Sequence, residues 1–283
     1  MLADLLDVLR CPVCAGRLEQ RAGALQCPQR HTFDVARQGY VNLLAGVASR
    51  TTADTADMVR ARDEFLTAGH YGPLAARLAD DAASAHRGTD SGTDPVVLDV
   101  GAGTGYYAAA VLDRVPRSRG LAMDASKFAA RQAARAHPRL AAAVWDAWRP
   151  WPVRDESVAV LLNVFAPRNA AEFRRVLLPA GTALVVTPTP AHLAELVEPL
   201  GLLAVDRQKD ERLEHGLASH LGLDHREELT FPLTLASADV ERLVRMGPSS
   251  WHIDEATLAA RLAALDEPVH AIASFNIGHY RRR

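Results

Sequence analysis

Residues 98–107 read LDVGAGTGYY, and this stretch decides the fold of the chain. Asp99 lies near the end of a short apolar run, VVLDV, of the kind that forms a buried strand. Gly101, Gly103 and Gly105 follow at alternate positions, and Thr104 stands between the last two. Glycines at this spacing let the backbone turn sharply and let its amides approach a ligand at the start of a helix. The stretch is therefore typical of the first strand, loop and helix of an α/β sheet that binds a cofactor.

Two features of this loop argue against a nicotinamide dinucleotide as the cofactor. The third glycine of a G-x-G-x-x-G fingerprint would fall at position 106, which is Tyr106. The carboxylate of Asp99 would repel a pyrophosphate, whereas it attracts the ammonium group of S-adenosylmethionine. The loop therefore favours S-adenosylmethionine.

Two further aspartates end expected strands and are candidate cofactor ligands. Asp124 ends the second strand and is expected to accept hydrogen bonds from the ribose hydroxyls. Asp146 ends the third strand and would meet the adenine edge. For each aspartate the alternative is a turn or helix-cap role, which a strand end often needs.

The same strand-and-helix unit repeats along the chain after residue 95. Apolar runs alternate with amphipathic segments, which indicates a parallel sheet covered by helices on both faces. Two further strand-like runs near the C-terminus are expected to form an antiparallel pair at one edge. The expected strands are 96–100, 120–124, 141–146, 157–165, 181–189, 227–236 and 269–283.

The three cysteines of the chain all lie between residues 11 and 31. Cys11, Cys14, Cys27 and His31 form the pattern C-x2-C-x12-C-x3-H, which supplies four ligands for tetrahedral zinc. The alternative is a pair of reactive or buried thiols with an incidental histidine. Because four protein ligands leave no open coordination position, the pattern predicts a structural metal that supplies much of the folding energy of a small module.

Composition limits the class of protein. The net charge of −2 over 283 residues argues against a chain that binds nucleic acid through overall charge. An odd number of cysteines argues against a disulfide framework. The sequence shows no apolar run of membrane-span length and no signal peptide, so we expect no membrane association and a cytoplasmic location.

With both motifs identified, the sequence resembles the RlmA family of 23S rRNA guanine-N1 methyltransferases, which includes the TlrB-type enzymes of macrolide-producing actinobacteria. The matching segments are CPQRHTFDVARQGYVNLL, DMVRARDEFLTAGHYGPL, VLDVGAGTGYY, MDASK, FAP, VTPTPAHLAEL and MGPSSWH.

The resemblance implies an α/β fold: a class I, Rossmann-like methyltransferase sheet with a small N-terminal zinc-ribbon-like domain. It divides the chain into a zinc-binding RNA-recognition domain (1–46), a helical linker region (47–94) and an S-adenosylmethionine-dependent methyltransferase domain (95–283).

The resemblance also assigns site residues. Cys11, Cys14, Cys27 and His31 fall on the four zinc ligands of the family, while Tyr71, Gly103, Thr104 and His192 match positions that contact S-adenosylmethionine. Pattern alone would make Tyr71 a core aromatic at a helix end and His192 a helix-start residue. One departure is the fourth strand, which has Val158 and Ala159 where class I methyltransferases often carry an acidic residue.

The implied reaction is transfer of a methyl group to N1 of a guanine in a 23S rRNA hairpin loop (hairpin 35, which lines the peptide exit tunnel near the macrolide site). Housekeeping and macrolide (tylosin-type) resistance remain alternative purposes. Asn163, at the carboxyl end of the fourth strand, is a candidate to orient the base, but an amide cannot deprotonate guanine N1 and no general base stands out. The family further implies a homodimer.

A hairpin loop makes it cheap to expose the pairing edge that carries guanine N1. The zinc module would then contact RNA phosphates through its arginines, or these would be solvated surface residues. They are Arg10, Arg17, Arg21, Arg30 and Arg37. Two alternative functions remain: a small-molecule (quinone-type) methyltransferase, which leaves the zinc motif without a purpose, and a non-catalytic zinc-dependent RNA-binding protein, which the glycine loop argues against.

Overall fold

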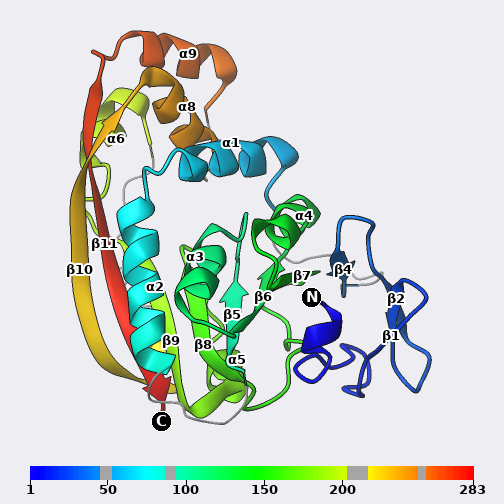
Figure 1. The fold of residues 1–283 in the computed structure, drawn as a ribbon. Coiled ribbons are helices and arrows are strands. Elements are labelled where there is room, and N and C mark those ends of the chain that lie inside the picture. The colour runs from blue at the N-terminus through cyan, green and yellow to red at the C-terminus, as the bar shows by residue number, and fades with distance from the viewer. Residues whose placement is uncertain (45–52, 87–93, 203–215, 248–252) are drawn as a thin grey trace.

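A computed structural model describes residues 1–44, 53–86, 94–202, 216–247 and 253–283 (Figure 1). Its main feature is an eight-stranded sheet with the strand order β10-β11-β9-β8-β5-β6-β7-β4. The seven strands after residue 95 are β5 (Val96–Val100), β6 (Arg119–Asp124), β7 (Leu140–Val144), β8 (Val158–Val164), β9 (Leu177–Pro188), β10 (Leu221–Leu235) and β11 (Val269–Arg282).

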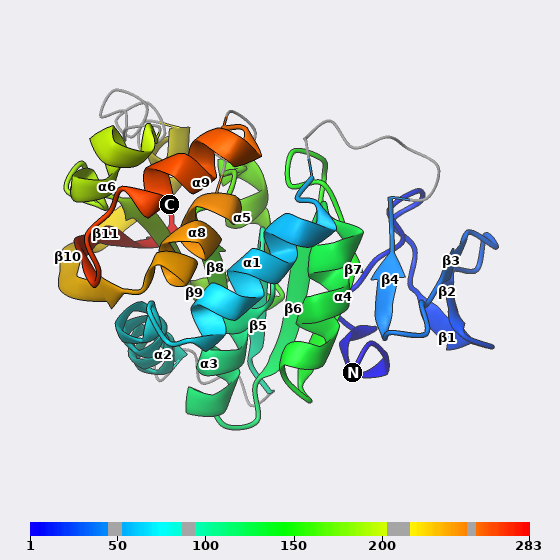
Figure 2. The same ribbon diagram turned by 90° about the horizontal axis from the view of Figure 1, so that it is seen from above.

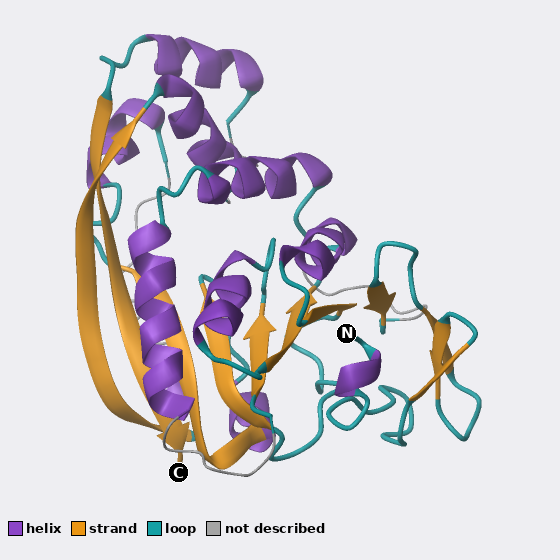
Figure 3. Ribbon diagram, viewed as in Figure 1, coloured by secondary structure: helices purple, strands orange, loops and turns teal. Residues whose placement is uncertain are grey.

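The predicted parallel sheet with an antiparallel pair at one edge is confirmed. Strands β5 to β9 pair in parallel, whereas β11 pairs antiparallel with both β9 and β10. The central strands β5, β7 and β8 are buried along their whole length, because helices cover both faces of the sheet. Figure 3 shows the long strands β9 to β11 curving along one side of the molecule.

The helices follow the predicted alternation. They are α1 (Ala56–Thr67), α2 (Gly72–His86), α3 (Tyr106–Arg114), α4 (Lys127–Ala136), α5 (Ala170–Val176), α6 (Ala194–Leu200), α8 (Ser237–Arg245) and α9 (Glu255–Ala263), with a short 3₁₀ helix η1 (Ala3–Leu5) near the N-terminus. Figures 1 and 2 show α1 crossing the edge at which β5 and β6 end, between α4 and α8, and it contacts both helices.

Local signals in the sequence explain where α1 begins and ends. The Thr55 side chain accepts a hydrogen bond from the N–H of Met58 (3.3 Å), which caps the first turn. Phe65 and Leu66 are buried beneath the helix, and the chain then turns at Gly69, whose φ of +86° suits glycine. The turn separates α1 from α2 and places Tyr71 directly before the first residue of α2.

The N-terminal module is a small antiparallel sheet joined to the main sheet. Strands β1 (Glu19–Arg21), β2 (Ala24–Gln26) and β3 (Thr32–Asp34) pair in sequence order. The first hairpin turns at Ala22 and Gly23, both with positive φ, as a two-residue type I′ turn requires. The next strand, β4 (Tyr40–Asn42), pairs in parallel with β7 and so extends the main sheet. The predicted module 1–46 thus contributes a strand to the neighbouring sheet, and its predicted boundary at residue 46 lies outside the described residues.

Two elements differ from the prediction for local reasons. Strand β7 ends at Val144 instead of residue 146, because Asp146 Oδ1 accepts the N–H of Trp148 (3.0 Å) and turns the chain. Helix α6 begins at Ala194, after His192, which the pattern placed at the helix start, because Leu193 has a left-handed φ of +54°. Within the described residues, we find no helix with the length and apolar character needed to cross a membrane.

Candidate active site and metal centre

A cavity of about 1040 Å³ lies at the carboxyl ends of the parallel strands, beneath α1 and α8. Sites for small-molecule ligands commonly occupy about 300–1,000 Å³, so this space lies at the upper end of that range. Seven predicted cofactor residues line it: Tyr71, Asp99, Gly101, Gly103, Thr104, Asp124 and His192. Gly105 and Asp146 are not among the described residues that line it.

The glycine loop shapes one wall of this cavity. Gly101, Gly103 and Gly105 all have positive φ, between +54° and +79°, which side chains rarely adopt. Gly101 lies directly against Ala166, since a Cβ on Gly101 would come within 2.4 Å of the Ala166 Cβ. Gly105 acts differently from its prediction, because it lets the start of α3 approach the backbone of Ala133 in α4.

Two buried carboxylates meet at the end of this loop. Both oxygens of Asp124 accept backbone N–H groups, from Gly103 (2.9 Å) and Ser126 (2.8 Å). Each oxygen keeps further acceptor capacity for ribose hydroxyls. Oδ2 of Asp99, by contrast, has no hydrogen-bond partner in the described structure although Asp99 is only 1% exposed.

Burial, together with the nearby charge of Asp124, raises the pKa of Asp99 to about 7. Burial also raises the pKa of Asp124. A cationic ligand group would relieve this cost, and the ammonium group of S-adenosylmethionine is such a group. The unpartnered Oδ2 therefore fits the role that was predicted for Asp99.

Tyr71 and His192 form a second pair of residues that line the cavity. The imidazole Nδ1 accepts the N–H of Ser274 (3.3 Å), while Nε2 lies 3.3 Å from the Tyr71 hydroxyl oxygen. Burial lowers the pKa of His192 to about 4, so the ring is neutral at pH 7. Because Nδ1 is the acceptor, the ring proton lies on Nε2 and is donated to Tyr71. His192 is therefore a hydrogen-bond donor to the Tyr71 hydroxyl at the cavity and a poor general base.

Asp146 and Asn163 lie behind the cavity wall and are both fully buried. The carboxylate of Asp146 closes the turn at Trp148, which is the turn-forming alternative noted for it. The Asn163 amide donates to the carbonyl oxygens of Val100 (3.4 Å) and Pro167 (3.0 Å). Asn163 is thus placed to hold the loop after β8, and it is absent from the described cavity lining.

Several lining residues were not predicted from the sequence. Arg62 of α1 is ion-paired with Asp54 and donates to the carbonyl oxygen of Met246 (2.7 Å), so it ties α1 across the cavity to the end of α8. Nothing in the helical pattern distinguishes Arg62 from the exposed arginines of the chain. Tyr107, Trp148 and Phe165 also line the cavity.

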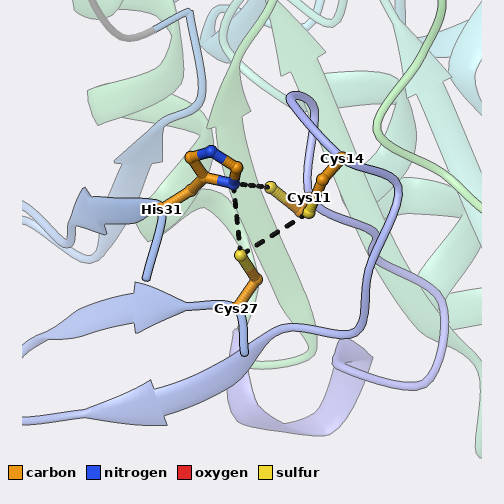
Figure 4. A group of neighbouring side chains, drawn as sticks. All are labelled: Cys11, Cys14, Cys27 and His31. Atoms are coloured by element: carbon orange, nitrogen blue, oxygen red, sulfur yellow. Dashed lines mark hydrogen bonds between the residues drawn. The ribbon is translucent and has the colours of Figure 1, made fainter. Parts of the chain in front are cut away.

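The four predicted zinc ligands converge at one point (Figure 4). The Sγ atoms of Cys14 and Cys27 are 3.6 Å apart, and Nδ1 of His31 lies 3.6 Å from Cys11 Sγ and 3.3 Å from Cys27 Sγ. A tetrahedral site with Zn–S of ~2.3 Å and Zn–N of ~2.0 Å has ligand separations of roughly 3.5–3.8 Å. The donor set and its spacing therefore fit a structural zinc ion.

The arginines of the zinc module divide into two groups. Arg17, Arg21, Arg30 and Arg37 are exposed. Arg10 instead donates to the carbonyl oxygen of Trp151 (3.3 Å) and pairs with Asp155 (3.4 Å). Its guanidinium joins the module to the main domain, which gives Arg10 a structural role besides the expected phosphate contact.

The sheet order, the glycine loop and the two buried acids define a class I S-adenosylmethionine-dependent methyltransferase that carries a zinc ribbon. Comparison with known families agrees. Residues 9–48 match the family described as "RlmA, N-terminal", and residues 97–181 match "Methyltransferase domain".

Three curated relatives extend this match. A Micromonospora griseorubida protein, provisionally named as a 23S rRNA (guanine-N(1)-)-methyltransferase, is 53% identical over 99% of both chains. The 23S rRNA (guanine(748)-N(1))-methyltransferase of Streptomyces fradiae is 49% identical over 94% of this chain and 93% of its own. The Bacillus subtilis protein YxjB, also provisionally named for guanine-N(1) methylation of 23S rRNA, is 33% identical over 67% of each chain. The chain belongs to the RlmA family of 23S rRNA (guanine-N1)-methyltransferases, and it is an enzyme that uses S-adenosylmethionine and a structural zinc ion.

Proposed function

We propose that this protein methylates N1 of a guanine in a hairpin loop of 23S rRNA. The observation that carries the proposal is the joining of two parts in one chain: a cavity suited to S-adenosylmethionine and a zinc ribbon with four exposed arginines. A methyltransferase for small metabolites has no need of the second part. A non-catalytic RNA-binding protein has no need of the first.

The relative named for guanine 748 supports the finer part of this proposal. We take the corresponding loop nucleotide, in hairpin 35 near the macrolide site, as the target, and tylosin-type macrolide resistance as the purpose. An enzyme that acts on ribosomal RNA belongs in the cytoplasm. The family resemblance further suggests a homodimer, which sedimentation of the purified protein would test.

Each cavity residue has a part in the reaction that we propose. When bound, S-adenosylmethionine supplies a methyl group on a good leaving group, so positioning provides most of the rate enhancement. Asp99 holds the ammonium group, Asp124 accepts from the ribose, and the glycine loop admits the cofactor close to its backbone. The Nε2–H of His192 orients the Tyr71 hydroxyl at the cavity wall.

Transfer of labelled methyl groups tests the proposed function. The protein is incubated with labelled S-adenosylmethionine and either unmethylated 23S rRNA, a transcript of the hairpin that contains guanine 748, or a metabolite extract. We expect label at one guanine in both RNA samples, and no label in a hairpin whose guanine 748 is replaced by adenine. Label confined to the metabolite extract would instead establish the small-molecule alternative.

A further inference from the structure

Phe165 is an aromatic residue held in an unusual position at the cavity. It follows β8 directly, its side chain is 45% exposed, and it lines the cavity. Its φ is +55°, a strained region that bulky residues rarely occupy. Its backbone N–H is nevertheless kept in place by a hydrogen bond to Val186 (3.2 Å). The fold therefore holds an exposed aromatic ring at the cavity despite backbone strain.

A cluster of buried rings supports Phe165 from behind. The ring of Phe165 lies 5.3 Å from that of Phe275, which is fully buried in β11. Phe275 in turn contacts Tyr71 at 5.2 Å and His192 at 4.6 Å, measured between ring centroids. Phe165 thus belongs to the same aromatic cluster as the two predicted cofactor contacts, and part of its ring remains free toward the cavity.

The loop that carries Phe165 is seated on the cofactor loop. Ala166 packs so closely against Gly101 that a Cβ atom on residue 101 would not fit. The side-chain amide of Asn163 donates to the carbonyl oxygens of Val100, which precedes Gly101, and of Pro167, which follows Ala166. These contacts set the distance between the ring of Phe165 and the place where the cofactor binds.

We propose that Phe165 is the platform on which the flipped target purine stacks, and that Asn163 positions its loop; this rests on the proposed function. The cavity of about 1040 Å³ lies at the upper end of the range for ligand sites, and this volume can hold a planar base beside the cofactor. Unpaired bases are commonly held by stacking on aromatic side chains. Arg168 of the same loop also lines the cavity and adds positive charge where RNA would enter.

Methyl transfer to the guanine 748 hairpin transcript tests the platform. Base–aromatic stacking is worth enough that Phe165→Ala should lower kcat/KM for RNA by roughly tenfold or more. Phe165→Tyr and Phe165→Trp keep a stacking face and should stay within about threefold of the wild-type protein. Affinity for S-adenosylmethionine, measured by calorimetry, should change by less than about twofold in all three variants.

Phe128 provides a matched control. It is also an exposed phenylalanine (38%), it lies at the start of α4, and it is outside the described cavity lining. Phe128→Ala should leave kcat/KM for RNA unchanged. A hairpin with 2-aminopurine at position 748 gives an independent readout, since its fluorescence should be quenched by the wild-type protein and remain bright with Phe165→Ala.

Three outcomes would overturn the proposal in different ways. Wild-type kcat/KM and quenching in Phe165→Ala would remove the platform and leave the proposed function intact. The same losses in Trp148→Ala but not in Phe165→Ala would move the platform to Trp148, which is 50% exposed at the same cavity. Failure of the wild-type protein to label RNA at all would remove the proposed function and the platform with it.

Discussion

At the scale of single residues, the site depends on charges that the fold buries before any ligand arrives. Asp99 is the clearest case, because it lines the cavity and its buried Oδ2 atom has no hydrogen-bond partner in the described structure. Burial holds its pKa near 7, well above the ordinary value of 3.8. A carboxyl group that is buried in this way destabilises the folded protein when it ionises. A bound cation would offset that cost.

The pKa of Asp99 makes cofactor binding depend on pH. Below pH 7 the free protein carries a proton on Asp99 that the ammonium group must displace, so affinity should weaken by up to about tenfold for each pH unit below 7. Calorimetry between pH 5.5 and 8 measures this. Asp99→Asn should bind more weakly at pH 8 and lose most of the pH dependence. Equal affinity of the wild-type protein at pH 6 and pH 8 would contradict the assigned role.

Burial of Asp99 also affects stability in the absence of cofactor. Its pKa is raised in the folded state, so between about pH 4 and pH 7 the folded protein binds more protons than the unfolded chain. Stability should therefore fall as pH rises through this window. Burial also raises the pKa of Asp124, so Asp124 should likewise lower the stability of the folded protein as pH rises.

At the scale of elements, two loops act as one unit. The glycine loop after β5 and the loop after β8 touch at Gly101 and Ala166 and are joined by the side chain of Asn163. Strand β8 lies next to β5 in the sheet, so both loops emerge at the same edge. Their contact explains why glycine is needed at position 101 for packing as well as for backbone conformation.

Gly101→Ala tests this contact. The added methyl group would meet Ala166 at 2.4 Å and hold an unfavourable φ of +73°, so we expect a loss of at least 1–3 kcal/mol in stability and at least tenfold weaker binding of S-adenosylmethionine. Thermal unfolding and calorimetry measure the two effects.

Gly23→Ala is the control for backbone strain alone. Gly23 has a similar φ of +82° in the β1–β2 turn, but nothing lies within 4 Å of an added Cβ. The Gly23→Ala variant should therefore be somewhat less stable than the wild-type protein and should bind S-adenosylmethionine with unchanged affinity. If both variants bind the cofactor equally well, packing against Ala166 is not what makes glycine necessary at position 101.

At the scale of the whole molecule, the zinc module and the methyltransferase sheet are physically continuous. Strand β4 pairs with β7, and Arg10 reaches Trp151 and Asp155 in the main domain. Folding of the module around zinc therefore fixes its exposed arginines relative to the cavity. A substrate that contacts the module is thereby presented to the cofactor in a defined orientation.

Salt dependence of RNA binding tests this arrangement. The double variant Arg17→Ala/Arg30→Ala should bind the hairpin transcript more weakly, and the slope of log K against log salt should shrink by about 1–2 units, as two lost phosphate contacts predict. Fluorescence anisotropy at several salt concentrations measures the slope.

Arg114→Ala/Arg117→Ala is the matched control for loss of charge. Arg114 ends α3 and Arg117 lies in the turn before β6, at the amino ends of the strands and away from the cavity. They are exposed and pair with Asp80 and Asp94, respectively. Their removal should leave the slope unchanged. A slope that is equally flat in both double variants would mean that the zinc module makes no specific contact with RNA.

Sequence by itself determined the parts of this protein that depend on local spacing. Alternating apolar runs predicted the parallel sheet, the glycine positions predicted the cofactor loop, and the spacing of three cysteines and one histidine predicted the zinc site. Each is a short-range property, because strand period, positive φ and knuckle geometry are set by neighbouring residues.

Only the tertiary structure decided which side chains share the cavity. Arg62 meets Met246, Phe165 meets Phe275, and Arg10 leaves the module to join Asp155, and each pair is far apart in the chain. Asp99, whose Oδ2 has no hydrogen-bond partner among the described residues, and Asp146, which closes a turn, likewise differ because of what surrounds them. Periodicity shows which face of an element is buried, but partners from distant elements are chosen by the packing of the whole sheet and its helices.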